Sequence, residues 1–436
     1  MAMRKFNFLL LLLILSAAVR GQQFLGTKTP YVEPGGDLTP PPAGYRPVFV
    51  NYVGRHGARF LTKSGADLAV LQVLEAADAA KGLTAPGERL LGVVKRLCAL
   101  QKDQYERITL LGAAEQRAIG QRLLDHYPGV FTGKGLDVVV TYKLRTRQSA
   151  DAFLQTFGGY QGAVHFSRKA DSLDDVLRFY DLSPAYQRYK KGAVVKKALD
   201  TLDSDRRTAA MAAGVCGRLF LLSYQLADSD KLNFTDNLYD IYSVQYSLTG
   251  EIKAAGFAVD SVDAGMAFTR EELDWEDFRS GAQDFLEKGP GRDPLGIQVK
   301  VAAPLLADII RSTDAGHVDA VLRFTHAEAI SPFASLLGIP EACVPAAAIY
   351  HYREGWHADG IIPLSANIQW IIYSNGKEKL VKVLLNEREV RLPVAGAVGP
   401  YYKWADLRAY CLARLEAVGA GLRGDMLGYL RLLPYR

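Results

Sequence analysis

Cysteine is scarce in this chain and never clustered. Only Cys98, Cys216, Cys343 and Cys411 are present among 436 residues, and no two of them form a Cys-x-x-Cys pair. This spacing disfavours a zinc ribbon or a thioredoxin-like redox motif. In an oxidising compartment the four cysteines could form two disulfides, with three possible connectivities. Buried free thiols are the alternative.

Long apolar runs are also missing, apart from one at the N-terminus. No later segment is long and apolar enough to span a bilayer. The N-terminal run follows the basic Arg4 and Lys5, ends near Leu15 and precedes small residues, a pattern typical of a cleavable secretory signal. We expect residues 1–21 to be removed and the protein to be secreted or periplasmic. An uncleaved N-terminal anchor is the alternative.

The chain has no strong excess of charge of either sign. Its formal net charge is +5, which falls to +2 when residues 1–21, holding three basic residues and no acidic one, are removed. This balance gives no reason to expect a nucleic-acid or membrane partner. Internal repeats and low-complexity tracts are absent, and 49% apolar and 23% charged residues are ordinary for a globular protein. If basic residues matter here, they matter by position.

Strand and helix patterns alternate through much of the chain, after an extended Gly- and Pro-rich entry segment at 22–46. The predicted strands are 47–53, 137–143, 163–167, 319–325, 367–374 and 379–386, the last two forming a hairpin. The predicted helices are 64–81, 87–101, 111–125, 146–157, 296–313, 327–337 and 403–418. This alternation predicts an α/β fold with a mostly parallel sheet and helices on both faces.

The composition changes in the middle of the chain. Residues 170–290 are rich in Lys, Asp, Tyr and Arg, and they show helical patterns without a convincing strand. We therefore expect a helical domain at 170–290, inserted into an α/β catalytic core formed by 47–169 and 291–436.

Polar segments follow three of the predicted strands. The first strand is followed by "GRHGAR", the second by "KLRTRQS" and the fourth by "THAE". Ligands of open α/β sheets bind beyond the carboxyl ends of the strands, so these segments should meet at one edge. The side chains brought together would be Arg55, His56, Arg59, Arg145, His326 and Glu328. Arg147 is the alternative to Arg145.

Such a cluster suits a phosphate dianion and a nucleophile. Guanidinium groups offer forked donors that match phosphate oxygens. Neighbouring arginines disfavour protonation of His56, which should be neutral and nucleophilic at mildly acidic pH. Its attack on phosphorus would form a phosphohistidine, and the departing alkoxide would need a proton, for which Glu328 is the candidate. The alternatives are a core histidine at 326 and an ordinary first-turn glutamate at 328.

The "RHGAR" motif with a distal "HAE" resembles the histidine acid phosphatases, specifically the branch of multiple inositol polyphosphate phosphatases and related bacterial phytases. The segments "TLLGAAEQRAIGQRL", "LRTRQSADAFL" and "VKVLLNEREV" are similar too, so the resemblance spans much of the chain. One departure is Leu61, where the family pattern often has proline; this concerns loop rigidity and none of the reacting groups.

The resemblance implies a phosphoglycerate mutase-like fold and hydrolysis of inositol polyphosphates such as phytate. It implies His56 as the nucleophile and Glu328 as the proton donor. It assigns the binding of phosphate to Arg55, Arg59, Arg145 and His326. No metal or other cofactor is expected, because the arginines supply the positive charge.

A substrate with several phosphates needs more cations than one site provides. Weaker candidates lie in the basic stretch 186–207, and they are Lys190, Lys191, Arg206 and Arg207. A solvated helix face is the alternative for this stretch. His351 and His357 match no common metal-site spacing.

We expect a monomer that acts on a small polyanionic substrate, without a nucleic-acid partner and without a membrane after signal cleavage. The alternative functions are a broad-specificity acid or sugar phosphatase, a mutase, and a non-catalytic protein that binds phosphorylated ligands.

Overall fold

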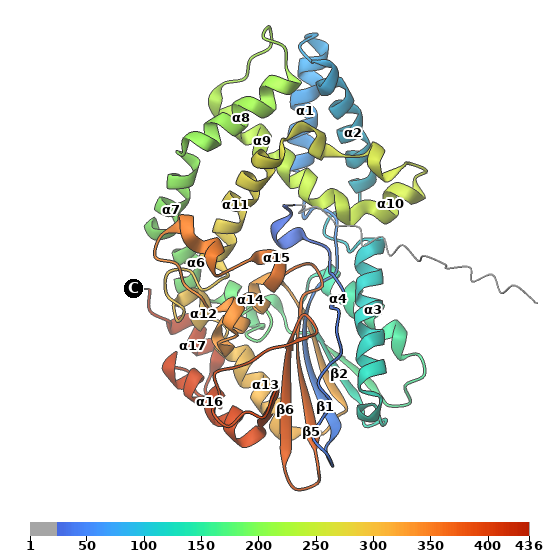
Figure 1. Cartoon of the computed structure of the whole chain (residues 1–436), viewed down its shortest axis with the longest axis vertical. Coiled ribbons are helices and arrows are strands. Elements are labelled where there is room, and N and C mark those ends of the chain that lie inside the picture. The colour runs from blue at the N-terminus through green and yellow to red at the C-terminus, as the bar shows by residue number, and fades with distance from the viewer. Residues whose placement is uncertain (1–23, 436) are drawn as a thin grey trace, which may run out of the picture.

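One eight-stranded sheet organises the chain (Figure 1). The structure, a computed structural model, describes residues 24–435, so the predicted signal at 1–21 lies outside the described residues. The strands lie in the order β3-β2-β4-β1-β5-β6-β7, and β8 pairs with β6. Their bounds are β1 Arg46–Arg55, β2 Leu136–Val140, β3 Val164–Ser167, β4 Ala320–Thr325, β5 Asn367–Ser374, β6 Lys379–Leu385, β7 Arg388–Glu389 and β8 Tyr401–Lys403.

The core of the sheet is parallel, as predicted. β4 pairs in parallel with both β1 and β2, and β2 pairs in parallel with β3. The predicted hairpin is formed by β5 and β6, with Ser374 opposite Lys379. Because β5 joins the sheet antiparallel to β1, the sheet as a whole is mixed.

Helices cover both faces of the sheet, which confirms the predicted α/β class (Figure 1). A hydrophobic core lies on each face of the sheet. Residues of β1 contribute alternately to the two cores, because successive side chains of a strand point to opposite faces. Phe49 and Val53 face a core shared with α13, α14 and α16, whereas Val50 and Tyr52 face α3 and α4. The bounds of these helices are α3 Leu110–His126, α4 Leu144–Leu154, α13 Ala303–Ala315, α14 Ala327–Leu337 and α16 Trp404–Ala417.

The chain between β3 and the short helix α12, Ile297–Lys300, is largely helical. Its α-helices are α5 Phe179–Leu182, α6 Pro184–Lys190, α7 Ala193–Asp203, α8 Arg206–Leu219, α9 Asp228–Gln245, α10 Thr249–Ala254 and α11 Arg270–Glu287. Two earlier helices, α1 Ala66–Ala79 and α2 Ala85–Gln101, share a separate hydrophobic core with α8, α9 and α10 (Figure 1). The sequence had placed α1 and α2 in the catalytic core. The division of the chain into domains stays a prediction. The packing of α1 and α2 favours grouping them with the helices between β3 and α12, and we call this group of helices the helical part.

Other differences from the predictions are local. The helix expected at 296–313 is two helices, α12 Ile297–Lys300 and α13, because the chain turns just before Pro304. The short helix α17, Met426–Leu432, was not predicted. All four cysteines are free, so the two possible disulfides are not formed and the free-thiol alternative holds. Within 24–435 no helix has the length and apolarity that a membrane span requires.

Candidate active site

The segment after β1 forms a tight loop against the start of α3. The backbone N–H of His56 donates to the carbonyl of Thr325 at 3.0 Å, which joins the ends of β1 and β4. A Cβ on Gly57 would lie 2.5 Å from the carbonyl oxygen of Gly112, and a Cβ on Gly112 would lie 2.1 Å from that of Ala58. Only glycine fits at both positions, so the loop lies directly on the helix.

Two adjacent polar residues of α3 form hydrogen bonds with this loop. The carboxylate of Glu115 accepts hydrogen bonds from the backbone of Ala58 at 2.9 Å and from Ser365 Oγ at 2.7 Å. Gln116 Nε2 donates to the carbonyl of Arg55 at 3.0 Å. The "AEQR" segment, which contributed to the family resemblance, therefore supports the backbone that carries His56.

The contacts of His56 determine which ring nitrogen carries its proton. Nδ1 lies 3.0 Å from the carbonyl oxygen of Gly57. Since a carbonyl only accepts hydrogen bonds, Nδ1 is protonated and Nε2 keeps its lone pair in the neutral ring. Burial, followed by the charges of Arg145 and Arg55, holds the pKa of His56 well below its usual range. The ring is therefore neutral and nucleophilic at Nε2.

Arg55 and Arg59 flank His56 and keep donors free for a ligand. Arg55 Nη1 donates to the carbonyls of Thr27 and Ile362 at 2.5 and 2.6 Å, and Arg59 Nη1 donates to that of Phe60 at 2.8 Å. The Nε atoms of both arginines are buried without an acceptor among the described residues. Burial lowers the pKa of Arg55 to about 10 and that of Arg59 to about 9, so both remain charged at neutral and acidic pH.

The start of α4 adds Arg145 to the cluster. Ser149 accepts from the backbone N–H of Gly57 at 3.0 Å and donates to the carbonyl of Arg145 at 2.7 Å, which ties this helix to the loop. Nε and Nη1 of Arg145 are also buried without a hydrogen-bond acceptor in the part of the chain described. Arg147, the alternative, instead pairs with Asp151 at 2.8 Å and is half exposed.

His326 and Glu328 come from the end of β4 and the first turn of α14. The rings of His56 and His326 lie 5.4 Å apart, centre to centre. Nδ1 of His326 is buried and has no partner among residues 24–435. Burial, followed by the charge of Arg145, holds the pKa of His326 well below its usual range. The two histidines predicted from distant motifs therefore lie together, and both are neutral.

Glu328 reaches the open side of the site, where its side chain is 36% exposed. Partial burial would raise its pKa, but the charge of Lys288, together with a backbone hydrogen bond and the charge of Arg55, outweighs that effect and holds the pKa of Glu328 below its usual range. Lys288 Nζ lies 3.8 Å from Glu328 Oε1 and 2.5 Å from Asp284 Oδ1. Without a ligand, Glu328 is thus a carboxylate facing a lysine.

Three charged residues of the site were not predicted from the sequence. Arg178 contacts His326, Lys288 faces Glu328, and Glu106 pairs with Arg145 at 3.6 Å. None belongs to a motif, and two of them come from the predicted helical insertion. The sequence offered a weak signal only for Arg178, which stands in the aromatic stretch "RFYD".

The weaker basic candidates are distributed differently. Lys190 Nζ lies 5.0 Å from the centre of the Tyr186 ring. Its positive charge favours the ionised form of Asp181, which is the ion-pair partner of Arg178. Arg207 pairs with Asp205, and its guanidinium lies 3.6 Å from the centre of the Trp275 ring. The roles of Lys190, Lys191, Arg206 and Arg207 stay predictions.

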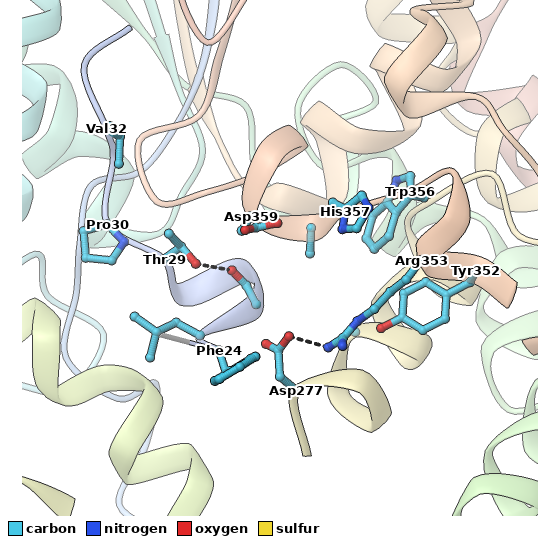
Figure 2. A pocket seen from close by; sticks show the side chains of 14 residues that line it. Phe24, Thr29, Pro30, Val32, Asp277, Tyr352, Arg353, Trp356, His357 and Asp359 are labelled. Atoms are coloured by element: carbon cyan, nitrogen blue, oxygen red, sulfur yellow. Dashed lines mark hydrogen bonds and ion pairs between the residues drawn. The ribbon is translucent and has the colours of Figure 1, made fainter. Parts of the chain in front are cut away.

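The described residues also enclose a separate cavity of about 220 Å³ (Figure 2). It lies between residues 24–32, the helix α11 and the turn that carries His357. Figure 2 shows the ion pair of Asp277 and Arg353 on its wall. None of the six residues predicted for catalysis and phosphate binding lines it.

Known proteins share a family model and a fold with this chain. The family model of the histidine phosphatase superfamily (branch 2) matches residues 48–386. The multiple inositol polyphosphate phosphatase of Bifidobacterium longum, solved with inositol hexasulfate, is similar with a TM-score of 0.77 and 21% identity, over 90% of this chain and 98% of that one. The phytase from D. castellii is similar with a TM-score of 0.69 and 18% identity, over 93% and 89%. No curated protein matches the chain.

Proposed function

The chain belongs to the histidine phosphatase superfamily (branch 2), and we propose that it is an exported phosphomonoesterase that hydrolyses inositol polyphosphates such as phytate through a phosphohistidine. One observation carries this proposal: a set of buried hydrogen-bond donors around His56 has no acceptor among the described residues. The set consists of the Nε atoms of Arg55, Arg59 and Arg145, and the buried Nδ1 of His326 joins it when that nitrogen carries a proton. Nη1 of Arg145 lies 3.6 Å from Glu106, beyond hydrogen-bond distance. Buried donors are costly when they are unpaired, and a phosphate group would satisfy them together.

In the first step, the lone pair on His56 Nε2 attacks phosphorus while the bond between phosphorus and the ester oxygen breaks. The developing negative charge on the phosphoryl oxygens lies among the arginine donors, which stabilise the transition state. The carbonyl of Gly57 keeps the proton on Nδ1, at 3.0 Å. The product is a phosphohistidine with its Nδ1 proton in place.

The leaving alkoxide must take up a proton as it departs. Glu328 is the proposed donor, although its carboxyl group is ionised in the free site. A bound phosphate brings negative charge that opposes the carboxylate and offsets the surrounding cations, so it raises the pKa of Glu328. We infer that Glu328 is protonated as substrate binds, by a proton from the phosphate monoanion or from solvent.

In the second step, Glu328 takes a proton from a water molecule, whose oxygen attacks phosphorus. The bond between Nε2 and phosphorus breaks, inorganic phosphate leaves and His56 returns to its neutral form. One carboxylate thus serves as acid and then as base.

Cations outside the phosphate clamp, the name used here for Arg55, Arg59 and Arg145, support a substrate with several phosphates. Lys288 faces the proposed proton donor, where the alcohol part of the ester would lie. Lys143, beside Arg145, pairs with Glu106 at 3.2 Å and could exchange that partner for a phosphate. The fold shared with proteins solved as inositol polyphosphate phosphatase and phytase supports the same substrate class.

Incubation with phytate and separation of the lower inositol phosphates over time tests the proposal. We expect stepwise release of phosphate, unaffected by a chelator because no metal takes part. Equal or faster hydrolysis of simple sugar phosphates would favour the broader phosphatase. Tight binding of phytate without any phosphate release would indicate a non-catalytic binding protein instead.

A further inference from the structure

The second ring nitrogen of His326 faces a group that can only donate. Arg178 Nη1 lies 3.2 Å from His326 Nε2. A guanidinium carries five N–H groups and no acceptor, and it stays protonated in proteins. Nε2 must therefore offer its lone pair to Arg178, which leaves the proton of the neutral ring on Nδ1.

Thr141 also contacts this nitrogen but does not choose a tautomer. Its Oγ1 lies 3.1 Å from His326 Nε2, and a hydroxyl can either donate or accept. With Thr141 alone, Nε2 could carry the proton and donate it to the hydroxyl. Arg178 is the contact that excludes this arrangement.

Arg178 is held firmly in this position. Its guanidinium pairs with Asp181, and it lies 4.7 Å from the ring centre of Tyr142 and 5.3 Å from that of Tyr180. The preceding residue is tied to the sheet, because Thr325 Oγ1 donates to the carbonyl of Leu177 at 2.8 Å. Leu177 precedes Arg178 and Thr325 precedes His326, so this hydrogen bond joins the chain neighbours of the two interacting residues.

The tautomer matters because only Nδ1 of His326 is free to bind a ligand. Nδ1 is buried without a partner in the described part of the chain, like the free donors of Arg55, Arg59 and Arg145. With a proton, Nδ1 donates to a phosphoryl oxygen. Without one, its lone pair would face that oxygen and repel it. The ring is neutral, because its pKa lies well below the usual range through burial and the nearby arginines.

We propose that Arg178 is a positioning residue that fixes His326 in the Nδ1–H tautomer, so that His326 acts as a donor to the phosphoryl group. The inference rests on the proposed function for its catalytic consequence but not for the tautomer itself. Arg178 lies in the predicted helical insertion, so this segment of the chain would determine the position of a proton on His326, which follows β4.

Nitrogen-15 NMR of histidine-labelled protein tests the tautomer directly. We expect the His326 ring of the wild type to show a protonated Nδ1 and an unprotonated Nε2, with the signal assigned through His326→Asn. In Arg178→Met, Thr141 is the one partner of Nε2 that remains among residues 24–435, and the ring should move toward the Nε2–H tautomer. Arg178→Lys, which still only donates, should retain the wild-type pattern if the ammonium reaches Nε2.

Kinetics on phytate provides the second readout. Loss of one donor to the transition state should lower kcat by about 10²-fold in Arg178→Met, with a smaller effect on KM and partial recovery in Arg178→Lys. Arg147→Met is the matched control, because Arg147 also forms an ion pair and lies over an aromatic ring, that of Phe166 at 3.9 Å. Its kinetics and its His326 signal should match the wild type.

Two results would overturn the proposal. The first is an unchanged Nδ1–H signal of His326 in Arg178→Met. The second is a rise in KM with kcat unchanged, which would make Arg178 a direct substrate ligand. If Arg178→Met does not fold, Arg178→Gln replaces it, since a glutamine amide can accept and should permit both tautomers. If the wild type releases no phosphate from any ester, the proposed function fails while the NMR result still decides the tautomer.

Discussion

At the residue scale, burial and nearby cations together determine the protonation of the proposed reacting groups. Burial, followed by the charges of the arginines proposed to bind phosphate, keeps His56 and His326 neutral. Lys288 keeps Glu328 ionised until a phosphate arrives. Binding and acid–base chemistry are therefore linked in this site, since a bound anion reverses the local balance of charge.

Replacing Glu328 by glutamine should lower kcat more for alkyl phosphates than for aryl phosphates, because their leaving groups differ in their need for a proton. Glu328→Gln cannot supply a proton, so we expect kcat on phytate and other alkyl phosphates to fall by about 10²- to 10⁴-fold. An aryl phosphate, whose leaving group needs little protonation, should lose much less. The inhibition constant of inorganic phosphate serves as the control for binding. Equal losses on both classes of ester would contradict a proton-donor role.

Replacing Lys288 should change the pH profile. In the wild type, kcat should decrease on the alkaline side as Glu328 loses its proton. On the acidic side kcat should decrease as His56 becomes protonated. Because the pKa of His56 lies well below 6.5, the ordinary value for histidine, this decrease should occur only well below pH 6.5. Lys288 favours the carboxylate, so Lys288→Met raises the pKa of Glu328 and should move the alkaline limb of kcat to higher pH by about one unit. Lys288→Arg keeps the charge and should keep the limb. A limb that moves to lower pH would contradict this account.

At the element scale, the contact between the His56 loop and α3 leaves no space for a side chain. Gly112→Ala would place a Cβ 2.1 Å from the carbonyl oxygen of Ala58. We expect a loss of about 1–3 kcal/mol in the free energy of unfolding, with a fall in kcat because the loop carries His56. Chemical denaturation and phytate kinetics measure the two effects.

Gly92→Ala is the control for this substitution. Gly92 also lies inside a helix, but a Cβ there meets nothing within 4 Å. Alanine should therefore stabilise the protein by about 0.5–1 kcal/mol and leave kcat unchanged. Similar effects of both substitutions would indicate that the packing of the loop on α3 is not what matters.

The strands and their ends could be predicted from the sequence, because local patterns determine them. The apolar run before Arg55 and the one before His326 each produce a buried strand, and parallel pairing of β1 with β4 brings their ends together. The packing of α1 and α2 could not be read in this way, since their apolar faces suit the sheet and the helical core equally well. Arg178 and Lys288 were missed because only the tertiary fold brings them to His326 and Glu328.

At the scale of the whole molecule, the site lies where the sheet, the helical part and the N-terminal segment meet. The carbonyl of Thr27 accepts from Arg55 at 2.5 Å, while the next residue, Lys28, pairs with Asp240 of α9 at 2.6 Å. The segment therefore contacts both the phosphate clamp and the helical part, and it directly follows the predicted signal peptide.

Export and processing can be measured on the full chain. Expression in a host with a secretion pathway should release a protein whose N-terminus lies near Gln22, as read by N-terminal mass spectrometry. Signal peptides end at small residues, and residues 16–21 are mostly small. Recovery of an intact N-terminus in the membrane fraction would support the uncleaved anchor instead.

Trapping the covalent intermediate tests the central claim most directly. The enzyme is mixed with phytate in the presence of a chelator, quenched within a turnover and digested under conditions that preserve phosphohistidine, and the peptide containing residues 55–59 is examined by mass spectrometry. We predict phosphate on His56 in the wild type and none in His56→Ala, whose release of phosphate should fall by about 10⁴-fold or more. Turnover of phytate without phosphate on His56, or full activity of His56→Ala, would contradict the account.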